Sequence, residues 1–317
     1  MARFLLKRIG LALITLILLS MIVFAVSTVL PGNVGRAVLG PFAAQESVDQ
    51  LNEQLGTNRP VLAQYWDWAS GIVQGDLGTS LTKQVPAWDL LGPALGNSFR
   101  LALVAFLICV PLSILGGVIA GLRYGKAADR GITIAGISFA AMPEFVSGIV
   151  LILVFSIWLG WLPVTAQWDE GAGVPTQVKH LLLPALTLTL VLFGYIARVA
   201  RAGMIEAFDS DYARTAYLKG LPHSVVVRKH ILRNALLPTI AVVAVQVGYL
   251  VGGLVAVEYL FNYQGLGLLT LEAARQKDLP LLVAGVLVIG IVYLVVTLVA
   301  DVVYALLNPR IRFGTTE

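Results

Sequence analysis

The sequence predicts an all-α polytopic membrane protein with six transmembrane helices and both termini in the cytoplasm. Of its 317 residues, 58% are hydrophobic and 13% are charged, whereas a soluble domain carries roughly a quarter charged residues. The mean hydropathy of +0.84 reflects several apolar runs, each close to the ~20 residues that a helix needs to cross a bilayer. Lys and Arg gather in alternate segments between these runs, which is the pattern of a multi-pass chain.

The first apolar run extends from about Ile9 to Leu30 and follows three basic residues. This start is similar to that of a signal peptide, but the apolar core of a signal peptide usually has only ~7–15 residues. We therefore predict a retained first transmembrane helix within a segment 1–30. Pro31-Gly32 ends it, because proline and glycine break a helix where the apolar pattern stops.

Residues 31–97 form the longest polar stretch, and we predict that they make a partly helical extracytoplasmic region. The composition of Gln45 to Leu55 favours a helix, and Gly56 to Pro60 favours a turn. A second turn cluster runs from Gly75 to Ser80. Between the turns, three aromatic residues suit a helix at the membrane interface: Tyr65, Trp66 and Trp68.

Five further apolar stretches predict the remaining spans, within a helical core over residues 98–310 that is followed by a tail, 311–317. The second of the five and the last are long enough to tilt or to extend beyond the bilayer. The expected spans are about Leu101–Leu122, Gly131–Leu159, Leu181–Ala197, Ala235–Val257 and Leu279–Leu307.

The basic residues set the expected orientation, because Lys and Arg in short loops favour the cytoplasmic side. We therefore expect region 31–97 and the loops near 160–180 and 258–278 to lie outside, and loop 201–234 to lie inside. Most of the 22 Lys and Arg residues fall on the side assigned to the cytoplasm: Arg3, Lys7, Arg8, Arg123, Lys126, Arg130, Arg198, Arg201, Arg214, Lys219, Arg228, Lys229, Arg233, Arg310 and Arg312.

The cytoplasmic stretch from Glu206 to Pro222 has a pattern that membrane insertion alone does not require. Asp209 or Ser210 can cap a short helix here, and Gly220 and Pro222 would end it. One face of this helix would carry mostly small residues, which permit close approach: Ala213, Ala216, Tyr217 and Gly220. Two interpretations stay open at this point, namely a helix that docks in a groove of a soluble partner and an ordinary solvated connector.

Motifs along essentially the whole chain resemble one family. They are Leu30-Pro-Gly32, Leu55-Gly56, Arg59-Pro60, Gln64-Tyr65, Gly75 to Ser80, His180, Leu183-Pro-Ala185, Arg233 to Pro238, Glu258, Gly265-Leu-Gly267 and Asp301 to Arg312. Together with the stretch from Glu206, they are similar to binding-protein-dependent ABC importer permeases, in the version found in dipeptide and oligopeptide permeases of the DppB/OppB type. The stretch itself resembles the EAA loop of that family, although Phe208 replaces its second alanine and Leu221-Pro222-His223 departs after the turn.

The resemblance implies that this loop is the coupling helix that docks on an ATPase subunit. The residues it assigns to coupling are Glu206, Ala207, Asp211, Tyr212, Arg214, Thr215, Ala216, Lys219 and Gly220. In this family the outer loop after Glu258 faces a substrate-binding protein, which implies contacts at Gln264, Gly265, Arg275 and Lys277.

As a member of that family, the chain would be a multi-pass permease in a bacterial inner membrane that imports di- or oligopeptides by alternating access. Its implied partners are a second, homologous permease in a heterodimer, ABC ATPase subunits, an extracytoplasmic substrate-binding lipoprotein and membrane lipid. ATP and Mg²⁺ would bind to the ATPase subunits, so no cofactor is expected in this chain. Glutathione, nickel chelates and other small solutes are alternatives to peptides.

Glu144 follows Pro143 near the middle of the predicted span 131–159. A carboxylate at membrane depth is costly, so we expect it to face a cavity or a partner. One interpretation places Glu144 on the transport pathway. The other holds that Pro143 kinks the helix and that Glu144 packs against a neighbouring helix.

Other functional classes have less support. The chain lacks a G-x-x-x-x-G-K-[ST] phosphate loop, so it is not expected to hydrolyse ATP or to be an enzyme. An intramembrane hydrolase would need a base near a buried serine, and no histidine lies within an apolar run. A secondary transporter would be expected to show inverted repeats. His180, His223 and His230 are too scattered for a metal site, and the basic residues form no soluble domain for nucleic acid.

Overall fold

The computed structural model describes residues 2–29, 34–40, 42–54, 56, 58–252 and 254–307. Within these ranges the chain is helical and contains no strand, apart from an isolated β-bridge between Thr79 and Pro86. The predicted stop at Pro31-Gly32 and the tail 311–317 lie outside the described residues. The all-α prediction is confirmed.

The chain divides into two compact units. Unit 1 comprises Met1–Ser98 and Gln264–Leu294, and unit 2 comprises Phe99–Tyr263 and Val295–Glu317. Two long helices, α5 (Ala87–Leu122) and α15 (Leu279–Leu307), contribute residues to both units.

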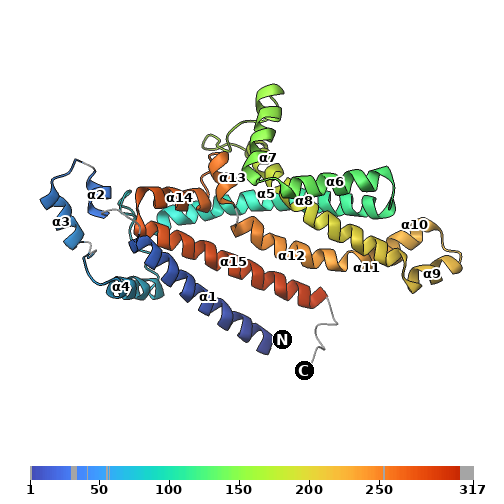
Figure 1. Ribbon diagram of the computed structural model, residues 1–317, viewed down its shortest axis with the longest axis horizontal. Coiled ribbons are helices and arrows are strands. Elements are labelled where there is room, and N and C mark those ends of the chain that lie inside the picture. Colours follow the sequence, from blue (N-terminus) through green and yellow to red (C-terminus); the bar gives the residue numbers. More distant parts are fainter. Residues whose placement is uncertain are drawn as a thin grey trace. The chain divides into compact units, whose positions relative to one another are not determined.

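Unit 1 contains the helices of the predicted extracytoplasmic region (Figure 1). The expected helix at 45–55 and the expected aromatic helix are both present, and Gly56 between them has a φ of +67°. In the aromatic helix, the side chains of Tyr65 and Trp68 pack against Phe24 of the N-terminal helix, residues 2–29. Trp66 of the same aromatic helix is exposed. Besides parts of α5 and α15, unit 1 holds α1 (Ala2–Val29), α2 (Val34–Leu39), α3 (Gln45–Gln54), α4 (Val61–Val73) and α14 (Leu266–Gln276).

A buried carboxylate ties together two distant segments of unit 1. The side chain of Asp278 is fully buried, and it accepts hydrogen bonds from the Ser80 hydroxyl at 2.5 Å and the Thr82 hydroxyl at 2.8 Å. The backbone N–H groups of Leu81 and Thr82 also donate to it, each at 3.1 Å. Because a buried charge is tolerated only when hydrogen bonds replace its hydration, this cluster fixes the predicted turn at 75–80 next to the start of α15.

Replacing Asp278 by alanine is expected to destabilise the protein by about 3 kcal/mol, because the buried Ser80 hydroxyl and three further donors lose their acceptor at once. The thermal midpoint of the detergent-purified protein should fall by several degrees. The matched control is Asp89→Ala in the exposed first turn of α5, which should shift the midpoint little. Equal midpoints for the two variants would contradict the role given to Asp278.

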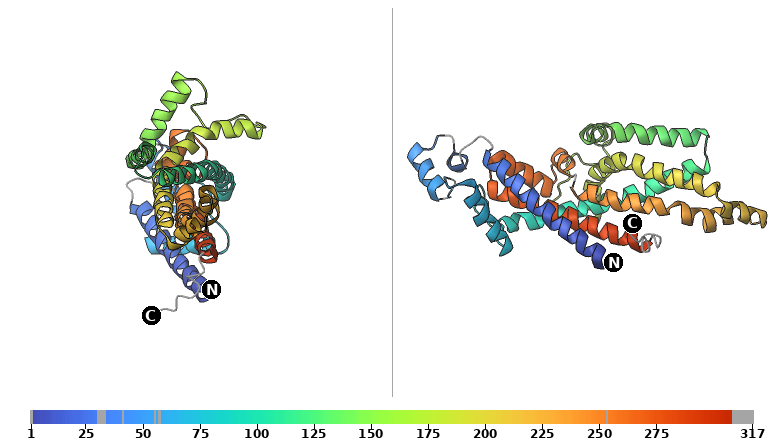
Figure 2. Two further views of the ribbon diagram at one scale, coloured as in Figure 1. Left: turned by 90° about the vertical axis from the view of Figure 1, so that its right-hand side faces the viewer. Right: turned by 60° about the horizontal axis from the view of Figure 1, so that its bottom comes forward.

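Unit 2 is built around α8 (Val174–Phe208), which contacts α6 (Ala127–Ala141), α7 (Glu144–Leu151) and α12 (Leu237–Gly252). Figure 2 shows α6 running alongside α8. Glycines permit this approach, because a Cβ on Gly194 would lie 2.1 Å from the Gly136 oxygen. A Cβ on Gly117 of α5 would likewise lie 2.4 Å from the Ala197 oxygen of α8. Small residues at helix contacts are typical of membrane proteins.

The prediction of one continuous span over 131–159 is wrong. The chain breaks between α6 and α7 and turns by 111°, and a π-helix, η1 (Ile152–Trp158), continues from α7. The cause is Pro143, because proline disfavours helical geometry in the residue before it, and Met142 is extended with a ψ of 135°. The interpretation in which Pro143 kinks the helix agrees with the position of this break, but the observed bend is far sharper than a kink.

The predicted span 235–257 also differs from the structure. The helix α12 ends at Gly252, and a separate helix, α13 (Val255–Leu260), follows it. On its N-terminal side, α10 (His223–Val225), η2 (Val226–Ile231) and α11 (Leu232–Ala235) form a run that bends by 45° into α12. These short helices replace the single long span that composition predicted.

The span count follows from these breaks. In the described ranges, four helices are long and apolar enough to cross a membrane, and six spans result if each of two bent pairs counts as one. The chain is thus a polytopic membrane protein. The six-span topology with cytoplasmic termini stays a prediction.

Candidate functional site

The predicted cytoplasmic helix is present as α9 (Asp211–Leu218). Of the two expected caps, Ser210 is the one observed, because its hydroxyl accepts a hydrogen bond from the backbone N–H of Ala213 at 3.4 Å. The helix ends before Gly220, whose φ of +74° suits glycine. No atom lies within 4 Å of a Cβ added at Gly220, so this glycine is required for the backbone turn and not for space.

The small-residue face of α9 packs inside this chain. Ala213 and Ala216 are buried in a cluster with residues from the end of α8 and from η2 and α11. The two alanines of this face therefore allow close approach within the chain itself. The physical role of this face is to fix α9 rigidly to α8, and the partners in the cluster are Met204, Ala207, Val226, Val227, Ile231 and Ala235.

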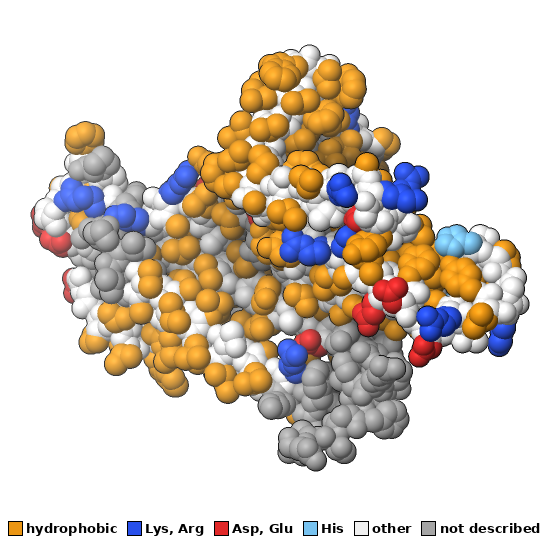
Figure 3. All heavy atoms as spheres, turned by 45° about the vertical axis from the view of Figure 1, so that its right-hand side comes forward, with side chains coloured by type: hydrophobic (Ala, Val, Ile, Leu, Met, Phe, Trp, Pro, Cys, Tyr) orange, Lys and Arg blue, Asp and Glu red, His pale blue; other side chains and the backbone are white. Residues whose placement is uncertain are grey.

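The opposite side of α9 is open. Leu218, on that side, is 82% exposed, and Tyr212 and Tyr217, which flank the buried alanines, are 40% and 39% exposed. Figure 3 shows hydrophobic, charged and histidine side chains together at the projecting end that carries α9 and α10. Of the residues assigned to coupling, Ala207 and Ala216 are buried, and seven are exposed: Glu206, Asp211, Tyr212, Arg214, Thr215, Lys219 and Gly220.

The two departures from the family pattern, Phe208 and the segment Leu221-Pro222-His223, contact each other in the structure. The ring of His223 stacks on Phe208 at 6.2 Å and on Tyr217 at 6.1 Å between centroids. Its Nδ1 is also 2.8 Å from the Tyr217 hydroxyl. This stack holds the segment after the turn against α9, so the two departures are structurally matched.

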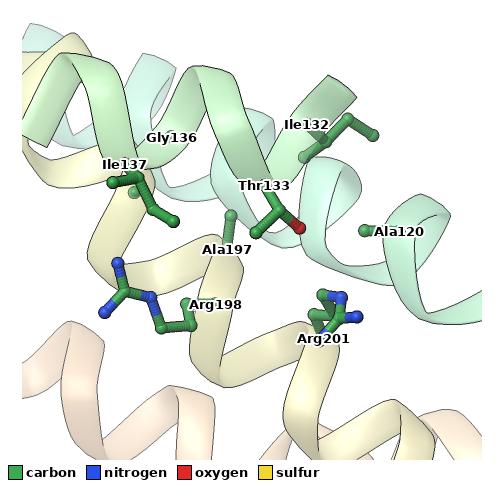
Figure 4. Close-up of a pocket in the computed structure, with 9 residues that line it drawn as sticks. Ala120, Ile132, Thr133, Gly136, Ile137, Ala197, Arg198 and Arg201 are labelled. Atoms are coloured by element: carbon green, nitrogen blue, oxygen red, sulfur yellow. The ribbon is translucent and has the colours of Figure 1, made fainter. Parts of the chain in front are cut away.

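An ion pair joins α6 to α8 two turns before α9. The Arg201 guanidinium donates two hydrogen bonds to the Asp129 carboxylate, at 2.5 and 2.9 Å, and it lies over the Tyr124 ring at 5.3 Å. Figure 4 shows Arg198 and Arg201 extending from α8 beside Thr133 of α6. The pocket that these residues line has a volume of only about 10 Å³, which is too small for a solute.

A much larger cavity lies at the break between α6 and α7, and Glu144 lines it. Its volume is about 840 Å³, and its walls come from α6, α7, α8, α12 and α13. The Tyr249 hydroxyl of α12 donates a hydrogen bond to Glu144 Oε1. Glu144 thus both faces a cavity and contacts a neighbouring helix, so the two interpretations of this residue are not exclusive.

The sequence alone did not point to several residues of the Glu144 cavity and of α9. Tyr249 and Gln246 line the Glu144 cavity, and their spacing of three positions within an apolar helix is a signal that was available. Leu218 was not singled out, because an exposed leucine in a membrane protein has no distinctive local pattern.

The residues expected to meet a binding protein lie on unit 1. Gln264 and Arg275 are exposed, Lys277 is half-buried, and Gly265, the N-cap residue that precedes α14, is buried. In unit 2, Glu258 is fully buried within α13. His180 Nδ1 lies 3.0 Å from the Thr165 carbonyl oxygen.

Comparison with known proteins gives one consistent result. Residues 113–313 match the family described as the binding-protein-dependent transport system inner membrane component, and residues 1–109 match the N-terminal family of the same membrane component. The glutathione transport system permease protein GsiC of Escherichia coli is 35% identical over 99% of this chain and 100% of its own length. The "Probable peptide ABC transporter permease protein y4tP" of Sinorhizobium fredii is 32% identical with the same coverage.

A solved structure, titled as the crystal structure of an amino acid ABC transporter with histidines, shares the fold. Its TM-score is 0.51 at 16% identity, and the match covers 70% of this chain and 94% of the other. The chain belongs to the family of binding-protein-dependent transport system inner membrane components. It is therefore a permease subunit of an ABC importer, a class in which separate subunits hydrolyse ATP.

Proposed function

We propose that this permease carries small peptides, glutathione among them, across a bacterial inner membrane, and that α9 couples it to ATP hydrolysis in separate ATPase subunits. The relatives named as glutathione and peptide permeases support this solute class. The observation that carries the coupling role is that α9 buries one face in its own chain and leaves Leu218 exposed on the other.

This arrangement suits the transmission of force. Ala213 and Ala216 lock α9 onto the end of α8, so a displacement of α9 moves α8 rather than a loose loop. The ion pair between Asp129 and Arg201 then joins α8 to α6. Exposed aromatic and leucine side chains on a rigid helix are the kind of anchors that fill a groove of a partner protein.

The remaining parts of the proposal follow from the charge pattern and the family. Residues 31–97 and the segment Gln264 to Lys277 face the outside, where a substrate-binding lipoprotein delivers the solute, and both termini lie in the cytoplasm. A second, homologous permease completes the pathway, and ATP with Mg²⁺ binds to the ATPase subunits.

The experiment is to purify the tagged chain from its native membrane in mild detergent and to identify the proteins that accompany it by mass spectrometry. We expect a second permease, ATPase subunits and a binding lipoprotein, and ATPase activity that rises when peptide-loaded lipoprotein is added. Recovery of an intact chain without these partners would contradict the proposal.

A further inference from the structure

We propose that the cavity beside Glu144 binds the ammonium group of the transported solute, so that the permease itself selects for a free amino group. Both short peptides and glutathione carry such a group. The identity of the solute as a peptide rests on the function proposed above. The preference of the cavity for cations does not, and it is tested with small charged reagents.

The size and lining of the cavity suit an organic solute. A volume of about 840 Å³ lies within the range of small-molecule sites, which combine apolar walls with a few polar groups. The polar side chains are those of Glu144, Tyr195, Gln246 and Tyr249, and the walls between them are apolar, with Met142, Phe145, Val191 and Leu192 among them.

The charge on the described walls of the cavity is negative. Among the described residues that line it, Glu144 is the one charged side chain, and no lysine, arginine or histidine faces it there. A carboxylate has about four acceptor positions, and the Tyr249 hydroxyl uses a position on Oε1. Acceptor capacity therefore remains for a cation that enters the cavity.

The break at Pro143 places this carboxylate at the start of a helix, and no fixed cation is present among the described residues that line the cavity. Glu144 is the first residue of α7, and the N-terminus of a helix stabilises a negative charge in its first turn. A permanent arginine partner would compete with the solute. Partial stabilisation by a helix end and one hydroxyl suits a site on a pathway, which must both accept its cargo and release it.

A purely structural role predicts different behaviour. If Glu144 served only to tie α7 to α12, removal of the Tyr249 hydroxyl would have the same effect as removal of the charge. If the carboxylate attracts cations, Tyr249→Phe keeps the charge and should keep the selectivity. These two variants separate the alternatives.

The test uses a cysteine reporter in the cavity. Cys109 is the only cysteine of the chain and is replaced by alanine, and Ala256, which is exposed and lines the cavity, is replaced by cysteine. The intact transporter is treated with a cationic methanethiosulfonate, the ethylammonium reagent, or with its anionic ethylsulfonate counterpart. The modification rate of this chain is followed by mass spectrometry.

With Glu144 present, the cationic reagent should react faster than the anionic one by roughly tenfold, because a nearby unit charge attracts the first and repels the second. In Glu144→Gln the ratio of the two rates should fall to the ratio found at a cysteine outside the cavity, and in Tyr249→Phe it should stay at the wild-type value. The matched control is Ala202→Cys on an exposed position of α8 outside the cavity, where Glu144→Gln should change nothing. An unchanged preference in the Glu144→Gln cavity reporter would overturn the proposal.

A second measurement addresses the solute. In proteoliposomes containing the whole transporter, uptake of dialanine should fall at least tenfold in Glu144→Gln and recover in part in Glu144→Asp. Dialanine uptake at the wild-type level in Glu144→Gln would refute ammonium binding. Loss of ATPase subunits from the purified complex would instead be a failure of the coupling proposal, and the reporter result would stand.

Discussion

Replacing Gly194 by valine is expected to abolish accumulation of the folded permease. A Cβ at this position would lie 2.1 Å from the Gly136 oxygen and 2.8 Å from the Gly136 carbonyl carbon. Both atoms are backbone, so no side-chain rotation relieves the clash, and α6 would have to move away from α8. Overpacking a tight contact typically costs about 1–3 kcal/mol and occasionally more, and this contact joins the two helices that position the Glu144 cavity.

The measurement is the amount of monodisperse protein by size-exclusion chromatography and its thermal midpoint. The matched control is Gly131→Val in α6, the helix that Gly194 of α8 packs against, because no atom lies within 4 Å of a Cβ added at Gly131. We expect near-normal yield from Gly131→Val and almost none from Gly194→Val. Similar yields would show that the close approach of α6 and α8 is not required for folding.

The second large effect concerns Leu218, the most exposed large hydrophobic residue of α9 at 82%. Replacing it by aspartate should leave the fold intact, because the side chain contacts little of its own chain. It should remove an apolar anchor from the ATPase interface, and such anchors are worth about 2 kcal/mol or more. Binding of the ATPase subunits should therefore weaken by roughly 30-fold.

The readouts for Leu218→Asp are recovery of ATPase subunits with the tagged permease and ATP-driven uptake in proteoliposomes. The conservative variant Leu218→Met keeps an apolar side chain of similar volume and should retain both. The thermal midpoint of each purified variant verifies folding. Full transport by Leu218→Asp would remove Leu218 from the coupling surface.

Much of the fold could be predicted, because long apolar runs and breaker residues are local signals. The helix at 45–54, the aromatic helix that follows it and the short helix capped by Ser210 all agree with local composition. The break at Pro143 was also visible, since proline restricts the residue before it. The angle of this break, 111°, could not be predicted from the sequence, because it depends on how α7 packs against α8 and α13.

The sites were predicted less well, because their geometry depends on contacts between distant segments. The small face of α9 has the same pattern whether it packs on its own chain or on a partner, and the buried cluster with Met204 and Val226 decides between the two. Asp129 and Arg201 form their pair across 72 positions. Asp278 likewise meets Ser80 across 198 positions, and no local pattern specifies either contact.

The most direct test of the central claim is photo-cross-linking from position 218. A benzoylphenylalanine is introduced at Leu218, and in a separate variant at Leu62, a leucine of similar exposure at 79% on α4 of unit 1. Irradiation of native membranes should join the permease to an ATPase subunit from position 218 and not from position 62. A cross-link from 218 to lipid alone, or to an ATPase equally from both positions, would contradict docking of α9 on the ATPase.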